Sequence, residues 1–359
     1  MRAWNLFFKT RIMRRFVVGG NFGDDLKQSS IVKKLATSLF ADLFNGGTIE
    51  NLETATKMVV DYDLVVWMPN ISNEIDKKYP RKKKGSILIC SKVIRGEVSD
   101  ENLGEAVGRI FKMNANAVIA IYKMGDKYRF KLIDALGNLW IDTDDVIELR
   151  KSIEKLAYWT KESIRVNSEK VEKETNSEVE QDFCDIIKVV SEKVESERGG
   201  RYFGNASTRC SFTFPSQRTL DSIFVSGRNT PKDFLTPEDF IPVNLVDDKI
   251  TYSGDRKPSV DTSIQLELYK KFTKINYIIH GHAYIEGVNM TDHYFPCGDM
   301  REVDSIVEAL DKSYNLCETC LNLRNHGFII FAETLSELKN FVSSAKFQYR
   351  DICEEITYE

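Results

Sequence analysis

Tyr277-Ile-Ile-His-Gly-His282 is the stretch that decides how the second half of this chain folds. Side chains on a β-strand alternate between its two faces, so two histidines separated by one residue point to the same side if the strand continues through them. The chain holds four histidines, and all of them lie between positions 280 and 326. This stretch therefore predicts a strand that ends in two converging imidazole groups.

A third histidine, His326, precedes the apolar run Phe328-Ile-Ile-Phe331, which predicts a strand beside the first one. Three neutral imidazole nitrogens with an open fourth position form the type of catalytic zinc site that polarises a substrate oxygen. We therefore expect His280, His282 and His326 to bind a divalent metal ion, with zinc as the expected ion. The remaining histidine, His293, is expected outside this set.

Six further motifs occur in a fixed order around the histidines. They are Phe203-Gly-Asn-Ala-Ser207, Phe224-Val-Ser-Gly227, Leu235-Thr-Pro-Glu-Asp239, Lys257-Pro-Ser-Val-Asp-Thr262, Pro296-Cys-Gly298 and Asn325-His-Gly327. In this order they resemble the class II aldolase and adducin head family, over roughly residues 200–345. The Asp-Thr pair and Leu268-Tyr269 are most similar to the ribulose-phosphate 4-epimerase branch of that family.

The resemblance implies a metal-dependent aldolase or epimerase that acts on a small phosphorylated sugar through a metal-stabilised enediolate. Asp261 corresponds to the family's acid/base residue, and Tyr294 is the candidate for its catalytic tyrosine. Asp261 would also serve as the N-cap of a following helix, so a purely structural role stays open. Family members form tetramers, which implies a homo-oligomer.

The same resemblance implies a pocket for the substrate phosphate, because glycines allow close backbone approach and short hydroxyls donate to an anion. Its candidate residues are Gly204, Asn205, Ser226, Gly227 and Ser259. Val260 stands where the family usually has a second serine, so this pocket lacks one hydroxyl donor. Two other functions stay open: a non-catalytic adducin-like binding module, and a dehydratase acting on a thiosugar phosphate.

The composition is that of an ordinary globular protein. Of the 359 residues 42% are hydrophobic and 29% charged, the net charge is −4, and no apolar run is long enough to cross a membrane. We therefore expect neither a nucleic-acid partner nor a membrane partner. Seven cysteines, an odd number without the dense spacing of a disulfide framework, favour the cytoplasm. Met13 directly precedes the first strand pattern and is an alternative start.

The first part of the chain has a different pattern, in which short apolar runs alternate with helix-length segments. This alternation predicts an α/β fold, with a three-layer Rossmann-like domain over residues 14–160. Its expected strands begin near Phe16, Leu64, Ser86 and Ala117. A charged linker is expected over 161–182, and the metal-binding domain, with a class II aldolase-like α/β/α fold, over 183–359, opening with an amphipathic helix over 183–194.

Two features of the first domain suggest a ligand. Gly19-Gly20-Asn21-Phe22-Gly23 follows the first strand, and a phosphate or nucleotide could bind at the start of the next helix. Polar residues such as Asp134 and Asn138 also flank a strand end, where open α/β sheets bind ligands. A structural turn at either place, or a regulatory or oligomerisation role for the domain, stays open.

Overall fold

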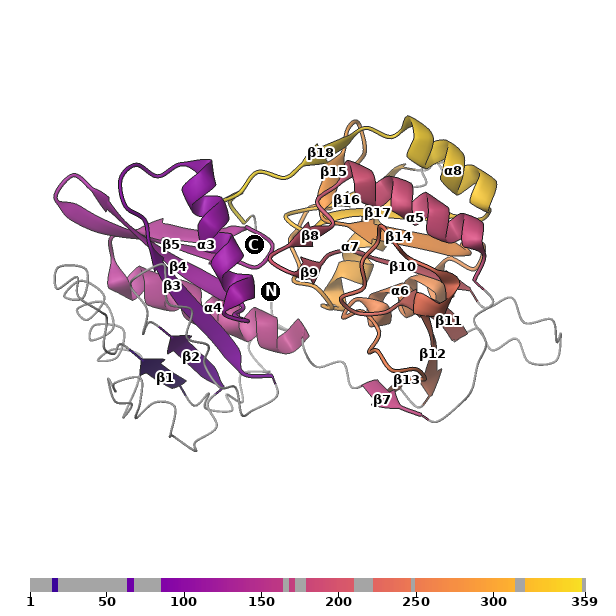
Figure 1. The fold of residues 1–359 in the computed structure, drawn as a ribbon, viewed down its shortest axis with the longest axis horizontal. Coiled ribbons are helices and arrows are strands. Elements are labelled where there is room, and N and C mark those ends of the chain that lie inside the picture. Colours follow the sequence, from indigo (N-terminus) through magenta and orange to yellow (C-terminus); the bar gives the residue numbers. More distant parts are fainter. Residues whose placement is uncertain are drawn as a thin grey trace. The chain divides into compact units, whose positions relative to one another are not determined.

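A computed structural model describes residues 15–18, 63–67, 85–163, 168–171, 179–209, 222–246, 249–313 and 320–356. The chain divides into two compact units, Met1–Lys161 and Glu162–Glu359. Each unit is built on its own β-sheet (Figure 1). Within the described ranges, no helix combines the length and the apolar composition that a membrane span requires.

The first unit contains a six-stranded sheet whose strands lie in sequence order. The first four strands run parallel, and the last three form an antiparallel meander. The strands are β1 (Arg15–Val18), β2 (Leu64–Trp67), β3 (Ile87–Val93), β4 (Ala117–Met124), β5 (Lys127–Asp134) and β6 (Leu139–Thr143), and the helices are α3 (Asp100–Lys112) and α4 (Val146–Ser163). The four predicted strands are therefore confirmed as one parallel set.

Continuous apolar sequence explains the centre of this sheet. Every residue of β2 and β3 is buried, as expected for strands that are covered on both faces. Helix α3 begins where the Ser99 hydroxyl accepts a hydrogen bond from the Asn102 backbone, and it buries Leu103, Val107 and Ile110. The described strands show no reversal of order, which a Rossmann fold has at its binding crevice. The Rossmann-like arrangement thus stays a prediction.

Asp134 forms a structural turn between β5 and β6. Its carboxylate accepts hydrogen bonds from the backbone amides of Leu136 and Asn138, the side-chain amide of Asn138 and the indole of Trp140. Asp134 and Asn138 are both buried, and the carboxylate oxygens are occupied by these donors. The polar segment at this strand end is explained by the turn itself. The glycine-rich loop after β1 lies outside the described residues.

The second unit contains an eight-stranded sheet with the order β16-β17-β14-β10-β11-β12-β13-β7. Its strands are β7 (Ser168–Lys170), β10 (Asn205–Arg209), β11 (Ser222–Ser226), β12 (Phe240–Val246), β13 (Lys249–Tyr252), β14 (Tyr277–Gly281), β16 (Cys320–Leu323) and β17 (Gly327–Ala332). Its helices are α5 (Gln181–Lys193), α6 (Thr262–Lys271), α7 (Arg301–Ser313) and α8 (Leu335–Ser344). Two small antiparallel pairs, β8 (Glu197–Arg198) with β9 (Arg201–Tyr202) and β15 (Ala283–Ile285) with β18 (Phe347–Tyr349), complete the unit.

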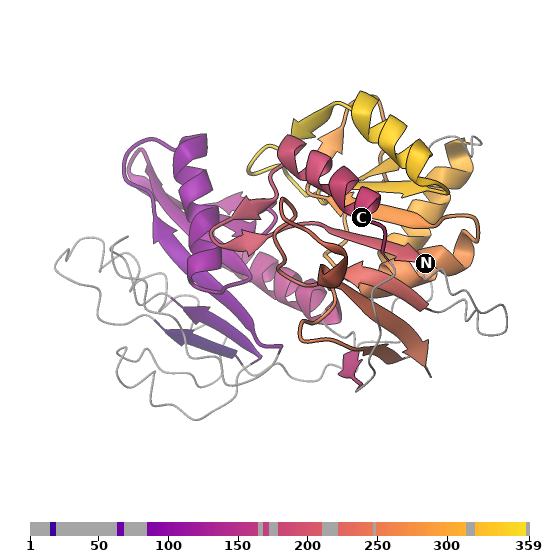
Figure 2. The ribbon, with the colours of Figure 1, turned by 45° about the vertical axis from the view of Figure 1, so that its right-hand side comes forward.

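Helices cover both faces of this sheet, as Figures 1 and 2 show. On one face, Phe183 and Ile187 of α5 and Leu338 of α8 belong to a core that includes Ile279 of β14. On the other face, α6 and α7 contribute to a second core, whose buried helical members are Ile264, Leu266, Leu268, Tyr269, Val303 and Ile306. The predicted α/β/α architecture is confirmed, and α5 matches the predicted amphipathic helix.

The segment expected to be a charged linker contains an edge strand. Residues Ser168–Lys170 pair in parallel with β13, and their side chains are exposed or half-buried. An edge strand of this kind is held by backbone hydrogen bonds, so it needs no apolar sequence. This explains why the polar composition of 161–182 gave no strand signal.

Candidate metal centre

The three predicted histidines meet at the ends of two neighbouring strands. Strands β14 and β17 are antiparallel, and their register pairs His280 with Ile329. His282 follows the end of β14, and His326 immediately precedes β17. The ring centroids lie 5.2 Å apart for His280 and His282, 4.7 Å for His280 and His326, and 5.5 Å for His282 and His326. One nitrogen from each ring lies within 4.8 Å of the other two.

Gly281 allows the two strands to bring these rings together. A Cβ atom at this position would lie 2.6 Å from the ring of Phe328, closer than real contacts allow. Phe328 is itself fully buried in the core of the unit. A side chain between the two histidines would therefore have to displace a core ring.

Hydrogen bonds orient two of the rings. The Nδ1–H of His280 donates to the carbonyl of Phe328 at 2.8 Å, which leaves Nε2 as the acceptor nitrogen. That Nε2 atom is buried and has no hydrogen-bond partner. The Nδ1–H of His326 donates to Oε1 of Glu302 at 2.7 Å. A carboxylate or carbonyl behind a metal-binding histidine fixes its tautomer in this way, and a buried nitrogen without a hydrogen-bond partner is available as a metal ligand.

The electrostatics favour neutral rings on β14. Burial, together with the neighbouring His326, lowers the pKa of His280 to about 4. Burial and the two other histidines lower the pKa of His282 well below its usual value. Burial opposes the charge of His326 too, but the nearby Glu302 carboxylate outweighs it and raises the pKa of that ring. The residues fit a divalent ion, because neutral imidazoles are its ligands and its charge would replace the proton at Nε2 of His326.

Asp261 lies close to this cluster. One carboxylate oxygen, Oδ2, accepts a hydrogen bond from the side chain of Asn205 at 2.9 Å. The other, Oδ1, is buried without a partner. Asp261 occupies the N-cap position of α6 but makes no side-chain capping bond. Helix capping, the structural role considered for Asp261 from the sequence, therefore does not explain why this carboxylate is buried there.

The predicted phosphate residues form a connected polar group. Asn205 donates to Ser259 at 3.1 Å and accepts from Gln265, while Ser226 accepts from the amide of Ala206 at 3.1 Å. Gly204 has φ 71°, and a Cβ atom there would lie 2.6 Å from the carbonyl oxygen of His280. The amide of Gly227 already donates to the carbonyl of Asp239 at 2.9 Å, so it is not free for a ligand.

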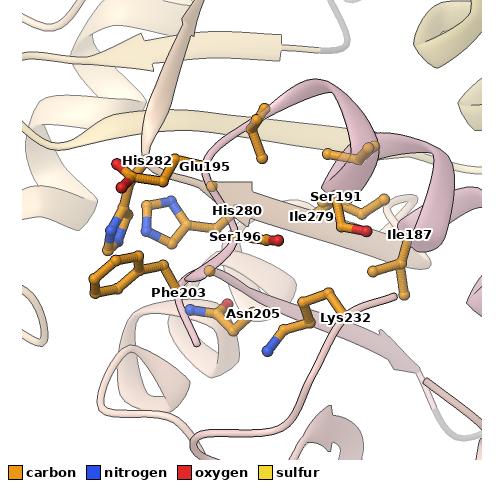
Figure 3. Close-up of a pocket in the computed structure, with 14 residues that line it drawn as sticks. Ile187, Ser191, Glu195, Ser196, Phe203, Asn205, Lys232, Ile279, His280 and His282 are labelled. Carbon is orange, nitrogen blue, oxygen red and sulfur yellow. The ribbon is translucent and has the colours of Figure 1, made fainter. Parts of the chain in front are cut away.

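A pocket beside the histidines contains a lysine that the sequence interpretation missed (Figure 3). Lys232 is 5% exposed and donates to the carbonyl of Thr230 at 2.7 Å. It forms no salt bridge with a carboxylate of the described residues, and in Figure 3 it points toward Asn205. Burial lowers its pKa to about 8. The pocket also includes His280 and His282.

Three other side chains change the predicted picture. Tyr294 is buried, with 2% of its surface exposed, and is absent from the residues that line this pocket. Its catalytic role remains a proposal without geometric support. Glu302 and Cys297, in contrast, both contact His326. The Pro-Cys-Gly motif marked Cys297 as a landmark, whereas a single glutamate on a helix gave no signal for Glu302.

One family model matches part of the second unit. Residues 185–286 match the model of the Class II Aldolase and Adducin N-terminal domain. The first unit is not matched. The second unit therefore resembles the class II aldolase fold, as the motifs predicted. No curated protein matches the chain.

Several solved structures are similar to this region. An L-fuculose 1-phosphate aldolase has 18% identity and a TM-score of 0.36, over 47% of this chain and 82% of that one. A sugar-phosphate aldolase from Thermotoga maritima has 13% identity and a TM-score of 0.34, over 45% and 89%. The N-terminal class II aldolase domain of a Thermoplasma acidophilum protein has 14% identity and a TM-score of 0.32, over 48% and 94%.

Proposed function

We propose that the second unit is a metal-dependent aldolase or epimerase-type lyase that acts on a small phosphorylated sugar. The convergence of three imidazoles, one with a buried and unpartnered Nε2, carries this proposal. His280, His282 and His326 would hold a divalent ion, with zinc as the expected species. When bound, the ion would polarise the carbonyl and hydroxyl oxygens of the substrate.

Asp261 is the proposed acid/base residue. Its Oδ1 atom is buried and free, so it can accept a proton from a substrate hydroxyl, while the bond from Asn205 to Oδ2 fixes the orientation of the carboxylate. Gln265 in turn donates to Asn205, which holds that amide in place. This chain of buried hydrogen bonds supports a positioned catalytic carboxylate.

Lys232 supports an anionic substrate. Its ammonium group is buried, lines the same pocket as Asn205 and two histidines, and lacks a carboxylate partner among the described residues. A buried positive charge without a counterion is costly, and a phosphate group would offset that cost. Together with Gly204, Asn205, Ser226 and Ser259, Lys232 would therefore bind the substrate phosphate. Gly227 would contribute only by letting the phosphate come close to the backbone, because its amide already donates to the carbonyl of Asp239.

An adducin-like binding module is the rival function. Such a module has no need for three converging histidines, two of which are buried and oriented by Phe328 and Glu302. We further propose a cytoplasmic homo-oligomer, in line with the cysteine pattern and the family's tetramers. Light scattering during size-exclusion chromatography tests the oligomer.

Elemental mass spectrometry of the purified full chain tests the metal site. About one zinc or other divalent ion per chain is expected, with loss in His280→Ala and His326→Ala and retention in His293→Ala, whose ring lies outside the cluster. Metal-loaded protein should then cleave or epimerise a sugar phosphate, and ³¹P NMR would monitor this reaction. Asp261→Asn should keep the metal and lose turnover. A natural protein that stays metal-free after zinc loading would contradict the proposal.

A further inference from the structure

The histidine cluster also contains a sulfur atom. Sγ of Cys297 lies 3.2 Å from Nε2 of His326. Because Nδ1 of that ring donates to Glu302, Nε2 is the only nitrogen of His326 that can bind a metal. The thiol therefore faces the same atom that the proposed ion would contact. Asp261, Cys297 and His326 form a second group whose ligand atoms all lie within 4.8 Å of one another.

The spacing between sulfur and nitrogen suits a shared ion. Zinc bonds measure about 2.0–2.1 Å to histidine nitrogen and about 2.3 Å to cysteine sulfur, so two such ligands at a tetrahedral angle lie about 3.6 Å apart. The observed 3.2 Å is close to this separation. A small movement of either side chain would place both atoms at bonding distance from one ion.

Two other potential ligand atoms of these groups lack hydrogen-bond partners. Nε2 of His280 is buried and unpartnered, and so is Oδ1 of Asp261. Cys297 and Asp261 are thus the two candidates for the position that three histidines leave open. Asn205 holds one oxygen of the Asp261 carboxylate, whereas the Cys297 thiol contacts His326 itself. A divalent ion also displaces a thiol proton readily, which creates a thiolate ligand.

We propose that Cys297 is the fourth ligand of the metal in the substrate-free protein. This inference rests on the proposed metal site and adds sulfur to it. Three imidazoles and one thiolate would supply the four ligands of a zinc site, so Cys297 would occupy the position that a substrate oxygen needs. A thiolate also selects zinc over magnesium and manganese, which prefer oxygen ligands. Cys297 thereby sets both the choice of metal and the condition for substrate entry.

Cobalt substitution provides the test, because a thiolate bound to Co²⁺ gives a near-ultraviolet charge-transfer band that nitrogen ligands do not give. The full chain is loaded with Co²⁺ as natural protein and as Cys297→Ser, Cys297→Ala and Cys353→Ser. Cys353 is the matched control, because it is another half-buried cysteine of the same unit and lies outside both ligand groups. Circular dichroism verifies that each variant is folded.

The band is expected in the natural protein and in Cys353→Ser, and absent from both Cys297 variants, which keep the visible cobalt bands. Zinc affinity in these variants should fall by about tenfold or more. Visible cobalt bands without the charge-transfer band in the natural protein, or a band that persists in Cys297→Ser, would overturn the assignment of Cys297 alone. A sulfur-ligated ion in a protein without turnover would support this inference and contradict the proposed activity. Failure to bind cobalt at all would overturn both.

Discussion

Nδ1 of His326 lies 2.7 Å from Oε1 of Glu302, and neither side chain is accessible to solvent beyond a few per cent. Glu302 stands at the start of α7 and His326 directly before β17. Burial raises the pKa of the carboxyl, and His326 opposes that shift. A helix and a strand are therefore joined by one buried hydrogen bond behind the proposed metal ligand.

Removal of this carboxylate should weaken the metal site. In Glu302→Ala, Nδ1 of His326 loses its acceptor, so the ring loses its fixed tautomer and orientation. Zinc affinity, measured by competition with a chromophoric chelator, should fall by about 10–100-fold. Glu308→Ala is the control, because Glu308 lies exposed on the same helix. Equal affinities in the two variants would show that Glu302 does not orient the ligand.

A methyl group at Gly281 should destabilise the second unit. It would overlap the buried ring of Phe328, and such overpacking costs about 1–3 kcal/mol. Urea unfolding of Gly281→Ala should show this loss. Gly108→Ala, in helix α3 with open space around the new Cβ atom, should leave the second unit unchanged. A Gly281→Ala protein as stable as the natural one would mean that Phe328 moves at little cost.

Arg209 should stabilise the end of helix α6. Its guanidinium donates to the carbonyl of Tyr269 in the last turn of the helix, and to the carbonyls of Phe272 at 3.2 Å and Ile275 at 2.6 Å just beyond it. In Arg209→Met these acceptors lose a charged donor, so the free energy of unfolding should fall by about 1–3 kcal/mol. The exposed Arg228 provides the control Arg228→Met. Equal urea midpoints for both variants would contradict a capping role.

Lys232 should give the stability of the protein a distinct pH dependence. Burial lowers its pKa from 10.5 to about 8 in the folded state. Below about pH 8 the lysine is charged in both states, and the folded protein bears the full burial cost. Between about pH 8 and 10.5 the unfolded chain binds more protons, so stability rises with pH.

The variant Lys232→Met should lack this contribution. The free energy of unfolding of the natural protein, relative to the variant, should therefore increase from pH 7.5 to pH 10 in phosphate-free buffer. Lys249→Met, which changes an exposed lysine, should run parallel to the natural protein over this range. If the free energy of unfolding of Lys232→Met also changes with pH in parallel with that of the natural protein, burial does not lower the pKa of Lys232.

The sequence predicted those parts of the structure that depend on local periodicity. The alternation around His280 and His282 predicted that their rings converge, which they do although β14 ends at Gly281, and the apolar run after His326 gave the neighbouring strand. The motif order predicted the class II aldolase fold, which the family model supports over 185–286. These signals are short in range, because each lies within one strand or one turn.

Other parts depend on contacts between distant residues, which no local pattern records. Glu302 and Cys297 reach His326 only through the packing of α7 and its preceding loop against β17. Strand β5 was not predicted, because Lys127, Arg129 and Lys131 make its first half strongly charged; Arg129 and Lys131 pair with Asp142 of the neighbouring strand β6. The burial of Tyr294 likewise follows from packing, which sequence spacing does not report.

The Gly281–Phe328 register has a consequence for the order of assembly. His282 and His326 are 44 positions apart in the sequence, and they come together when β17 pairs with β14. The two strands would therefore have to pair before an ion could bind all three histidines. The binding energy of the ion would then add to the stability of that pairing. Removal of the ion by a chelator should accordingly speed amide hydrogen exchange at this strand pair first. The metal would then stabilise the sheet in addition to its role in catalysis.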